Sequence, residues 1–150
     1  MTTLAATEIA SIVDGTSNTL LLSEVIQGQD QGSTLDLRGF IQYGSSSGFA
    51  TYLPPNSPQP DMLNDAVYCV YPGSNNPPCK FRTAAPPAYP GDTTPSVNAD
   101  TYAARSRHSG GVNSVFADGS VHFTKNTISL NTWRALSTTR GGEVISADSL

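Results

Sequence analysis

The chain has 150 residues, of which 37% are hydrophobic and only 13% are charged, and this length allows one domain, residues 1–150, with a modest core. The net charge is −4 and the eight Lys and Arg residues are scattered, so we expect no nucleic-acid partner. The longest apolar run near the start, around Leu20–Leu22, is far too short to cross a bilayer, so we expect no membrane span in this chain.

The first part of the chain predicts one short helix and one strand. Apolar residues within 4–13 share a helical stripe. Residues 19–26 contain consecutive leucines and predict a buried central strand, which carries Glu24 near its far end. A carboxylate in such a place requires a partner, and Arg105, Arg107 or backbone N–H groups are the candidates.

The middle of the chain alternates short strand patterns with turns that are rich in Gly, Pro, Ser and Asn. Strands are predicted over 35–43, 49–53 and 66–71, and a helical turn over 61–63. Residues 75–99 form a proline-rich loop, which is either an ordered surface excursion or mobile.

Two cysteines, Cys69 and Cys79, flank a segment that is rich in Pro, Gly and Asn. They predict a local disulfide if the protein is exported, and two free thiols if it is not. A metal site is not expected at these cysteines, because their spacing does not suit one and neither histidine is near in sequence.

The strongest local signal is a hairpin between residues 112 and 124. Two β-prone runs are separated by Asp118-Gly119, a pair that is typical of a two-residue turn. That turn pairs Phe116 with Val121 and therefore decides which side chains share a face. The predicted buried face carries Val112, Phe116, Val121 and Phe123, and the mixed face carries Asn113, Val115, Ser120, His122 and Thr124.

The C-terminal part predicts a helix over 127–140 with Ser129 as its N-cap, followed by a short strand over 143–145. The apolar face of this helix carries Leu130, Trp133 and Leu136. Taken together, the elements predict an α+β fold: a mainly antiparallel β-sheet with the C-terminal hairpin, one or two short helices and many loops.

Three ordered motifs carry a family resemblance. His108 is followed by nine residues and then Asp118-Gly119; residues 12–24 read Ile-Val-Asp-Gly-Thr-Ser-Asn-Thr-Leu-Leu-Leu-Ser-Glu; and the ending runs from Trp133 to Val144. This set resembles the prepilin-type proteins grouped as DUF1559, with their C-terminal His-x9-Asp-Gly motif. The resemblance covers nearly all of this chain but only the latter part of a typical member, whose leader and hydrophobic N-terminal helix we do not find here.

The resemblance implies a non-enzymatic, pseudopilin-like protein, exported or at the cell surface, which acts through self-assembly or through protein partners. The motif residues are then structural: Asp14, Gly15, Asn18, Glu24, His108, Asp118, Gly119 and Trp133. An acid–base dyad of His108 and Asp118 is disfavoured, because the strand between them is roughly 20 Å long at about 3.3 Å per residue. We expect instead that a largely buried His108 ring fastens the open end of the hairpin.

The alternative function is a small hydrolase of the glycosidase or esterase type. In that case His108 meets Glu24 or Ser23 across the sheet, and the catalytic candidates are Glu24, His108 and Asp118. We expect no cofactor, although oxygen ligands from Asp14, Asn18 and Asp118 are weak candidates for holding Ca²⁺.

Overall fold

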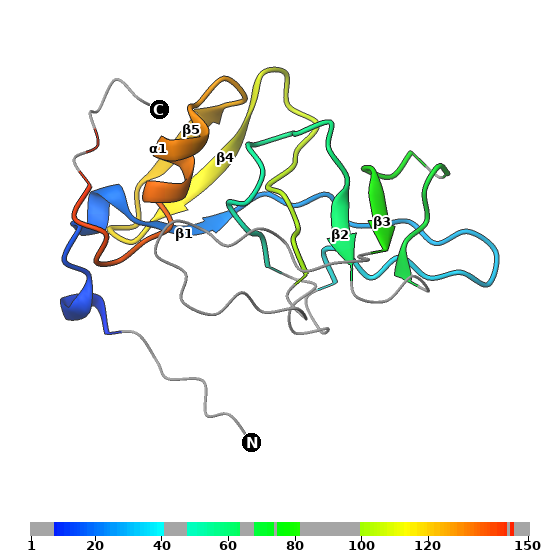
Figure 1. The fold of residues 1–150 in the computed structure, drawn as a ribbon, viewed down its shortest axis with the longest axis horizontal. Coiled ribbons are helices and arrows are strands. Elements are labelled where there is room, and N and C mark those ends of the chain that lie inside the picture. The colour runs from blue at the N-terminus through cyan, green and yellow to red at the C-terminus, as the bar shows by residue number, and fades with distance from the viewer. Residues whose placement is uncertain are drawn as a thin grey trace.

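The computed structural model describes residues 8–40, 48–63, 68–73, 75–81, 100–143 and 145. Its elements are the short 3-10 helices η1 (Ile9–Ser11) and η2 (Thr16–Asn18), the strands β1 (Leu20–Ser23), β2 (Asp61–Leu63), β3 (Cys79–Phe81), β4 (Gly111–Phe116) and β5 (Val121–Lys125), and the helix α1 (Leu130–Ala135). Figure 1 shows β1, β4, β5 and α1 grouped at one end of the molecule and β2 and β3 at the other. No helix within these ranges is long and apolar enough to span a membrane.

The larger sheet is antiparallel and has the order β1-β4-β5, while β2 and β3 form a separate parallel pair. The predicted α+β fold with a mainly antiparallel sheet, few helices and many loops is therefore confirmed. The prediction of a buried central strand over 19–26 is wrong. The central strand is β4, whereas β1 lies at an edge with Leu21 and Leu22 59% and 60% exposed.

The main core lies between the sheet and α1. Its buried side chains are Ala104, Val112, Phe116, Ile128, Trp133 and Leu136. Ser129 is the N-cap of α1, as predicted, and its side chain accepts a hydrogen bond from the Thr132 N–H. The Trp133 indole N–H donates to the Leu53 carbonyl at 3.0 Å, which ties the helix to a loop. The helix is shorter than predicted, since it ends at Ala135.

The hairpin forms where it was predicted, but its register differs by one residue. The Phe116 N–H donates to the Ser120 carbonyl, and Ala117, Asp118 and Gly119 make a three-residue loop in which Gly119 has a φ of +85°. Three-residue hairpin loops commonly end with such a left-handed residue, and Asp-Gly suits them as well as it suits a two-residue turn.

This shift moves every side chain of β5 to the opposite face from the predicted one, because side chains alternate along a strand. Val121 and Phe123, predicted to be buried, are 63% and 45% exposed. Thr124, predicted on the mixed face, is fully buried beside Ser114.

Several short predicted elements are also wrong. Residues 61–63 form strand β2 and not a helical turn, and η1 is the only helical segment in the described part, 8–13, of the helix predicted over 4–13. No strand occurs in the described parts of 35–43, 49–53, 66–71 and 143–145. Residues 4–7, 41–43, 66–67 and 144 of these predictions lie outside the described residues, as does the 82–99 part of the predicted proline-rich loop.

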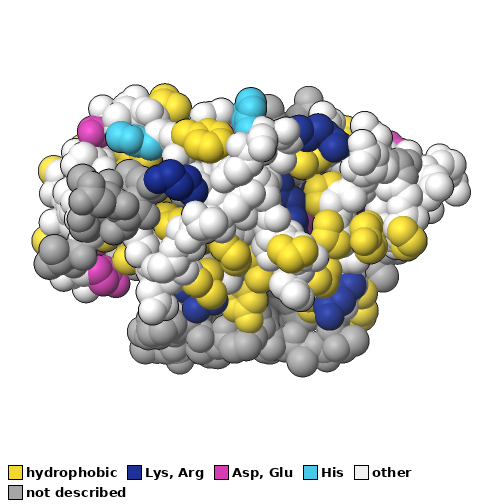
Figure 2. Space-filling model, turned by 90° about the horizontal axis from the view of Figure 1, so that it is seen from above, with side chains coloured by type: hydrophobic (Ala, Val, Ile, Leu, Met, Phe, Trp, Pro, Cys, Tyr) yellow, Lys and Arg dark blue, Asp and Glu magenta, His cyan; other side chains and the backbone are white. Residues whose placement is uncertain are grey.

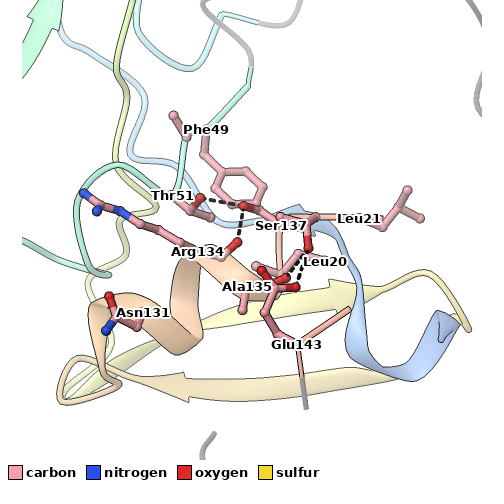
Figure 3. Close-up of a pocket in the computed structure, with 11 residues that line it drawn as sticks. Leu20, Leu21, Phe49, Thr51, Asn131, Arg134, Ala135, Ser137 and Glu143 are labelled. Carbon is pink, nitrogen blue, oxygen red and sulfur yellow. Dashed lines mark hydrogen bonds between the residues drawn. The ribbon is translucent and has the colours of Figure 1, made fainter. Parts of the chain in front are cut away.

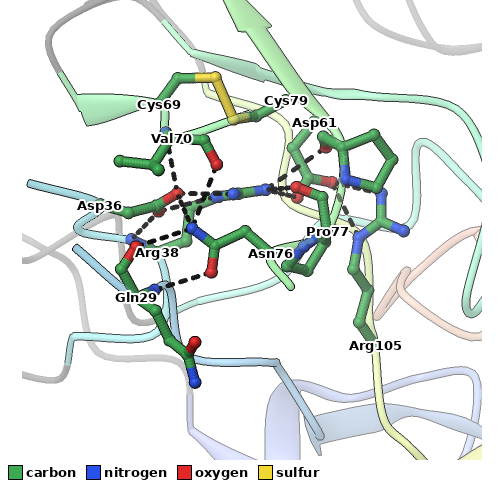
Figure 4. Close-up of a disulfide and its surroundings, with 11 residues drawn as sticks. Gln29, Asp36, Arg38, Asp61, Cys69, Val70, Asn76, Pro77, Cys79 and Arg105 are labelled. Carbon is green, nitrogen blue, oxygen red and sulfur yellow. Dashed lines mark hydrogen bonds and ion pairs between the residues drawn. A yellow bond between two sulfur atoms is a disulfide. The ribbon is translucent and has the colours of Figure 1, made fainter. Parts of the chain in front are cut away.

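A network of buried ion pairs holds the half of the molecule around β2 and β3 (Figure 4). Arg38 makes two hydrogen bonds to the Asp36 carboxylate, at 2.9 and 2.6 Å, and a third to Asp61 at 3.1 Å. Arg105 donates to the same Asp61 at 2.8 Å. Two arginines and two aspartates thus neutralise one another where water is excluded, since all four residues are at most 5% exposed.

Asn76 and the disulfide complete this half. The Asn76 amide donates to Asp36 and to the carbonyls of Gln29 and Val70, and its oxygen accepts the Gln29 N–H. Cys69 and Cys79 are joined by a disulfide with a Cα–Cα distance of 5.9 Å. The disulfide therefore closes the loop that carries Asn76 over the ion pairs.

Removing one arginine from this network should destabilise the protein strongly. Arg38→Ala leaves Asp36 buried without a cation and leaves Asp61 with Arg105 as its remaining ion-pair partner among the described residues. We expect the free energy of unfolding to fall by about 3–5 kcal/mol. Chemical denaturation measures this change. Arg107→Ala, which removes an exposed arginine, is the matched control and should cost less than about 0.5 kcal/mol. Equal losses in the two variants would contradict the assignment.

The disulfide should also contribute measurable stability. Cys69→Ala with Cys79→Ala opens a short loop, and we expect the free energy of unfolding to fall by roughly 2–3 kcal/mol. Thermal melts of the wild type with and without reductant give the same comparison without any mutation. Complete thiol labelling of the native, air-exposed protein would show that this bond does not form.

Candidate functional site

The motif residues gather at the two ends of the central strand β4, beside η2 and the hairpin loop at one end and beside Glu24 at the other. We name these groups the tip cluster and the open-end cluster. The tip cluster contains Asp14, Thr16, Asn18, Thr19, Asp118, Gly141 and Gly142. The open-end cluster contains Glu24, His108 and Asn113.

In the tip cluster, residues 14–19 form a tight turn that receives the end of the hairpin. Gly15 has a φ of +92°, which a residue with a side chain rarely adopts, and the Asn18 amide donates to the Asp14 carbonyl. The Asp118 N–H donates to the Thr16 carbonyl at 3.2 Å. The Ala117 N–H donates to the Thr19 carbonyl at 2.8 Å. The hairpin loop is therefore hydrogen-bonded to the motif of residues 12–24.

Asp14 fastens the C-terminal segment to the same place. Its two carboxylate oxygens accept the N–H groups of Gly141 and Gly142, each at 2.8 Å, and one of them also accepts the Thr138 hydroxyl. The Gly142 N–H is the largest influence that lowers the pKa of Asp14, and Gly141 and Thr138 add to it. Asp14 is therefore a structural acceptor that is stable as the anion.

Asp118 stabilises its own loop. Its carboxylate accepts the Ser120 hydroxyl at 2.6 Å and the Ser120 N–H at 2.9 Å, and these bonds lower its pKa. The three calcium candidates Asp14, Asn18 and Asp118 all lie in the tip cluster, where both carboxylate oxygens of Asp14 and one of Asp118 accept hydrogen bonds from the protein. Within the part of the chain that the structure describes, no three His, Cys, Asp or Glu residues are grouped as for a metal ion.

The open-end cluster is organised around Glu24. Its carboxylate accepts the Asn113 N–H at 2.7 Å, the Asn113 side-chain amide at 3.1 Å and the His108 ring nitrogen Nε2 at 3.1 Å. Burial alone would raise the pKa of Glu24, but these hydrogen bonds and the nearby His108 lower it below its ordinary value. Backbone N–H groups are thus partners of Glu24, as expected, whereas Arg105 pairs with Asp61.

His108 contacts Glu24, one of the partners considered for it, but the prediction of a largely buried ring is wrong. Its side chain is 55% exposed and packs edge-on against Phe123 at a centroid distance of 6.4 Å. The Phe123 ring lies over Gly111, where any Cβ atom would come within 3 Å of it. The one-residue shift of β5 places Phe123 on the outer face of the sheet, away from the core, and the His108 ring packs there against it.

The structure brings together only some of the residues that were candidates for catalysis in a hydrolase. Glu24 and His108 are in contact, but the Ser23 hydroxyl bonds to the Asn113 carbonyl and the Ser114 hydroxyl. Asp118 lies at the other end of β4, about 20 Å away along a six-residue strand. Ser23 is therefore engaged within the sheet, and the serine next to His108 is Ser106, whose hydroxyl accepts the His108 backbone N–H and donates to the Gly111 carbonyl.

Two hollows lie near the clusters. An open polar hollow of about 440 Å³ includes Asn75, Arg107, His108 and Asn126 in its lining. A larger, mainly apolar cleft of about 870 Å³ lies between β1, the Phe49 segment and α1 (Figure 3). Neither hollow is lined by Glu24.

The sequence reasoning missed the ion-pair network, and the second histidine as a contact residue. Asp36 and Arg38 alternate with leucines in Leu-Asp-Leu-Arg, and two opposite charges at alternate positions of an apolar run were an available signal of a buried pair. His122 bonds to Ser120 and packs edge-on against Phe116 at 4.9 Å. That contact depends on the register of β5, which local sequence did not determine.

Comparison with known proteins adds one finding. No curated protein and no solved structure matches the chain. A family model described as "Protein of unknown function (DUF1559)" matches residues 1–131, a span that includes both clusters except for the C-terminal glycines of the tip cluster. Because this match covers most of the 150 residues, the chain belongs to the DUF1559 family.

Proposed function

We propose that this domain is a non-enzymatic, pseudopilin-like part of an exported protein, which acts at the cell surface through assembly or protein contact. The observation that carries the proposal is that the motif carboxylates serve as structural hydrogen-bond acceptors. Asp14, Glu24 and Asp118 each accept hydrogen bonds from the protein's own backbone N–H groups. Asp14 and Glu24 join segments that are far apart in sequence, and Asp118 stabilises its own loop. The three carboxylates do not converge on a cleft.

Two further features support the proposal. A carboxylate whose pKa is lowered, as that of Glu24 is, stays ionised at neutral pH and is a poor general acid for glycoside hydrolysis. The Cys69–Cys79 disulfide suits an oxidising compartment outside the cytosol. The resemblance to prepilin-type proteins points to the same place of action.

The competing function is hydrolysis by Glu24 and His108, and one experiment separates the two. We expect the purified wild type to show no turnover of ester, glycoside and phosphoester substrates. We expect His108→Ala to lower the free energy of unfolding by less than about 1 kcal/mol, because the ion pair is largely exposed. Glu24→Ala should cost about 1–2 kcal/mol, because the Asn113 N–H loses its acceptor.

The exported role is tested separately, in whole cells. A tagged copy of the intact gene product should be digested when protease is added to whole cells. Turnover by the wild type that disappears in His108→Ala, with an unchanged melting temperature, would overturn the non-enzymatic role. Full protection of the tagged protein inside intact cells would overturn the exported one.

The structural role of Asp14 predicts a specific pH dependence. The pKa values of Asp14 and Glu24 are lowered by folding from ordinary values of 3.8 and 4.5, so their contribution to stability is complete above those values and is lost as the pH falls further. The wild-type melting temperature should therefore be level from about pH 7 to pH 5 and fall in more acidic buffer. Differential scanning calorimetry across this range measures the profile.

Asp14→Asn isolates the contribution of the tip cluster. Asparagine offers one acceptor oxygen to the two glycine N–H groups, so the variant should melt lower than the wild type at pH 7 and lose less on acidification. Glu8→Gln, at an exposed position, is the matched control and should follow the wild-type profile. A profile of Asp14→Asn parallel to that of the wild type would contradict the role.

A further inference from the structure

Among the described residues, the outer edge of β5 has no partner strand. In the sheet β5 pairs with β4 alone, and no other described strand lies beyond it. Two backbone hydrogen bonds, from Phe116 to Ser120 and from Asn126 to Gly110, fix which residues face β4. Because hydrogen-bonded and non-hydrogen-bonded pairs alternate along an antiparallel ladder, Val121 and Phe123 direct their backbone N–H and C=O groups away from β4.

The same two residues make this edge apolar. Val121 is 63% exposed and Phe123 is 45% exposed, and Leu22 continues the apolar surface across the sheet at 60% exposure. Figure 2 shows hydrophobic side chains between the two histidines on one face of the molecule. Natural proteins usually protect an edge strand with charges, proline or a bulge, yet within β5 the one charged residue is Lys125 at its end.

We infer that β5 is the strand through which two copies of this domain pair with each other. The two β5 strands run antiparallel about a two-fold axis at Phe123 and join the two three-stranded sheets into one sheet of six strands. This inference rests on the proposed assembly role and names the contact surface for it.

A second copy fits this edge because the strand is complementary to itself. Pairing about Phe123 sets the two Phe123 side chains next to each other and brings Val121 beside the second copy's Lys125. The strand carries no carboxylate, and the two lysines lie four residues apart along the pair. That separation is about 13 Å, which exceeds the screening length of roughly 10 Å in 0.1 M salt.

The other edge of the sheet does not offer the same opportunity. Strand β1 has an irregularity between Leu20 and Leu22, and the Leu20 N–H already donates to the Leu136 carbonyl at 2.7 Å. Pairing through β5 alone therefore closes at two copies and does not continue into a fibre. The contact is short, so the dimer should be weak in solution and stronger where copies are held close together.

The test uses the whole 150-residue chain at high concentration. Sedimentation velocity should show a concentration-dependent dimer for the wild type. Val121→Lys, which places a charge on the edge, should raise the dissociation constant by about tenfold or more. Leu22→Lys adds the same charge to the same face but on β1, and should leave the dimer unchanged. Thermal melts check that both variants remain folded.

A covalent trap provides the second measurement. Phe123→Cys should form a disulfide-linked dimer under mild oxidation, because paired residues about 5.5 Å apart lie within the range of disulfide geometry. Leu22→Cys should not form one. A wild type that remains monomeric, or equal effects of Val121→Lys and Leu22→Lys, would overturn pairing through β5. Neither result would affect the proposed non-enzymatic, exported role, which is tested by turnover and protease access.

Discussion

The fold depends on carboxylates that accept backbone N–H groups from distant parts of the chain. Asp14 holds Gly141 and Gly142, and Glu24 holds Asn113. In the other half, Asp36 accepts the Val70 N–H and Asp61 accepts the Ala103 N–H. A buried N–H without a partner is costly, and the described part of the chain has only short strands, whose ladders supply few acceptors. Side-chain oxygens therefore take the place of neighbouring strands.

This constraint explains why the two halves differ in charge chemistry. At the ends of β4 the carboxylates are partly exposed, so water stabilises the anion and no buried cation is needed. Asp36 and Asp61 are almost completely buried, and there Arg38 and Arg105 must balance them. The disulfide closes the loop over this second group, where loss of either arginine would leave an uncompensated charge.

The sequence predicted the features that local chemistry determines. These are the position of the hairpin at Asp118-Gly119, the Ser129 cap and the pairing of the two cysteines. It did not predict the buried ion-pair network, since Asp61 and Arg105 meet the neighbouring residues Asp36 and Arg38 only after the chain has folded. The central position of β4 was missed for a related reason. The leucines of β1 suggested burial, whereas Leu21 and Leu22 lie exposed at a sheet edge.

The length of one turn connects the fold to the proposed contact surface. A two-residue turn at Asp118-Gly119 would place Val121 and Phe123 against the core and Thr124 outside. The three-residue loop does the opposite, because one added residue reverses the face of every following side chain. Asp118 stabilises this loop by accepting hydrogen bonds from Ser120. The motif of residues 12–24 also stabilises it, because the Thr16 and Thr19 carbonyls accept backbone N–H groups of the loop. The tip cluster therefore controls, from the end of the hairpin that carries the loop, which side chains of β5 lie on the outer face of the sheet, where the contact with a second copy is proposed.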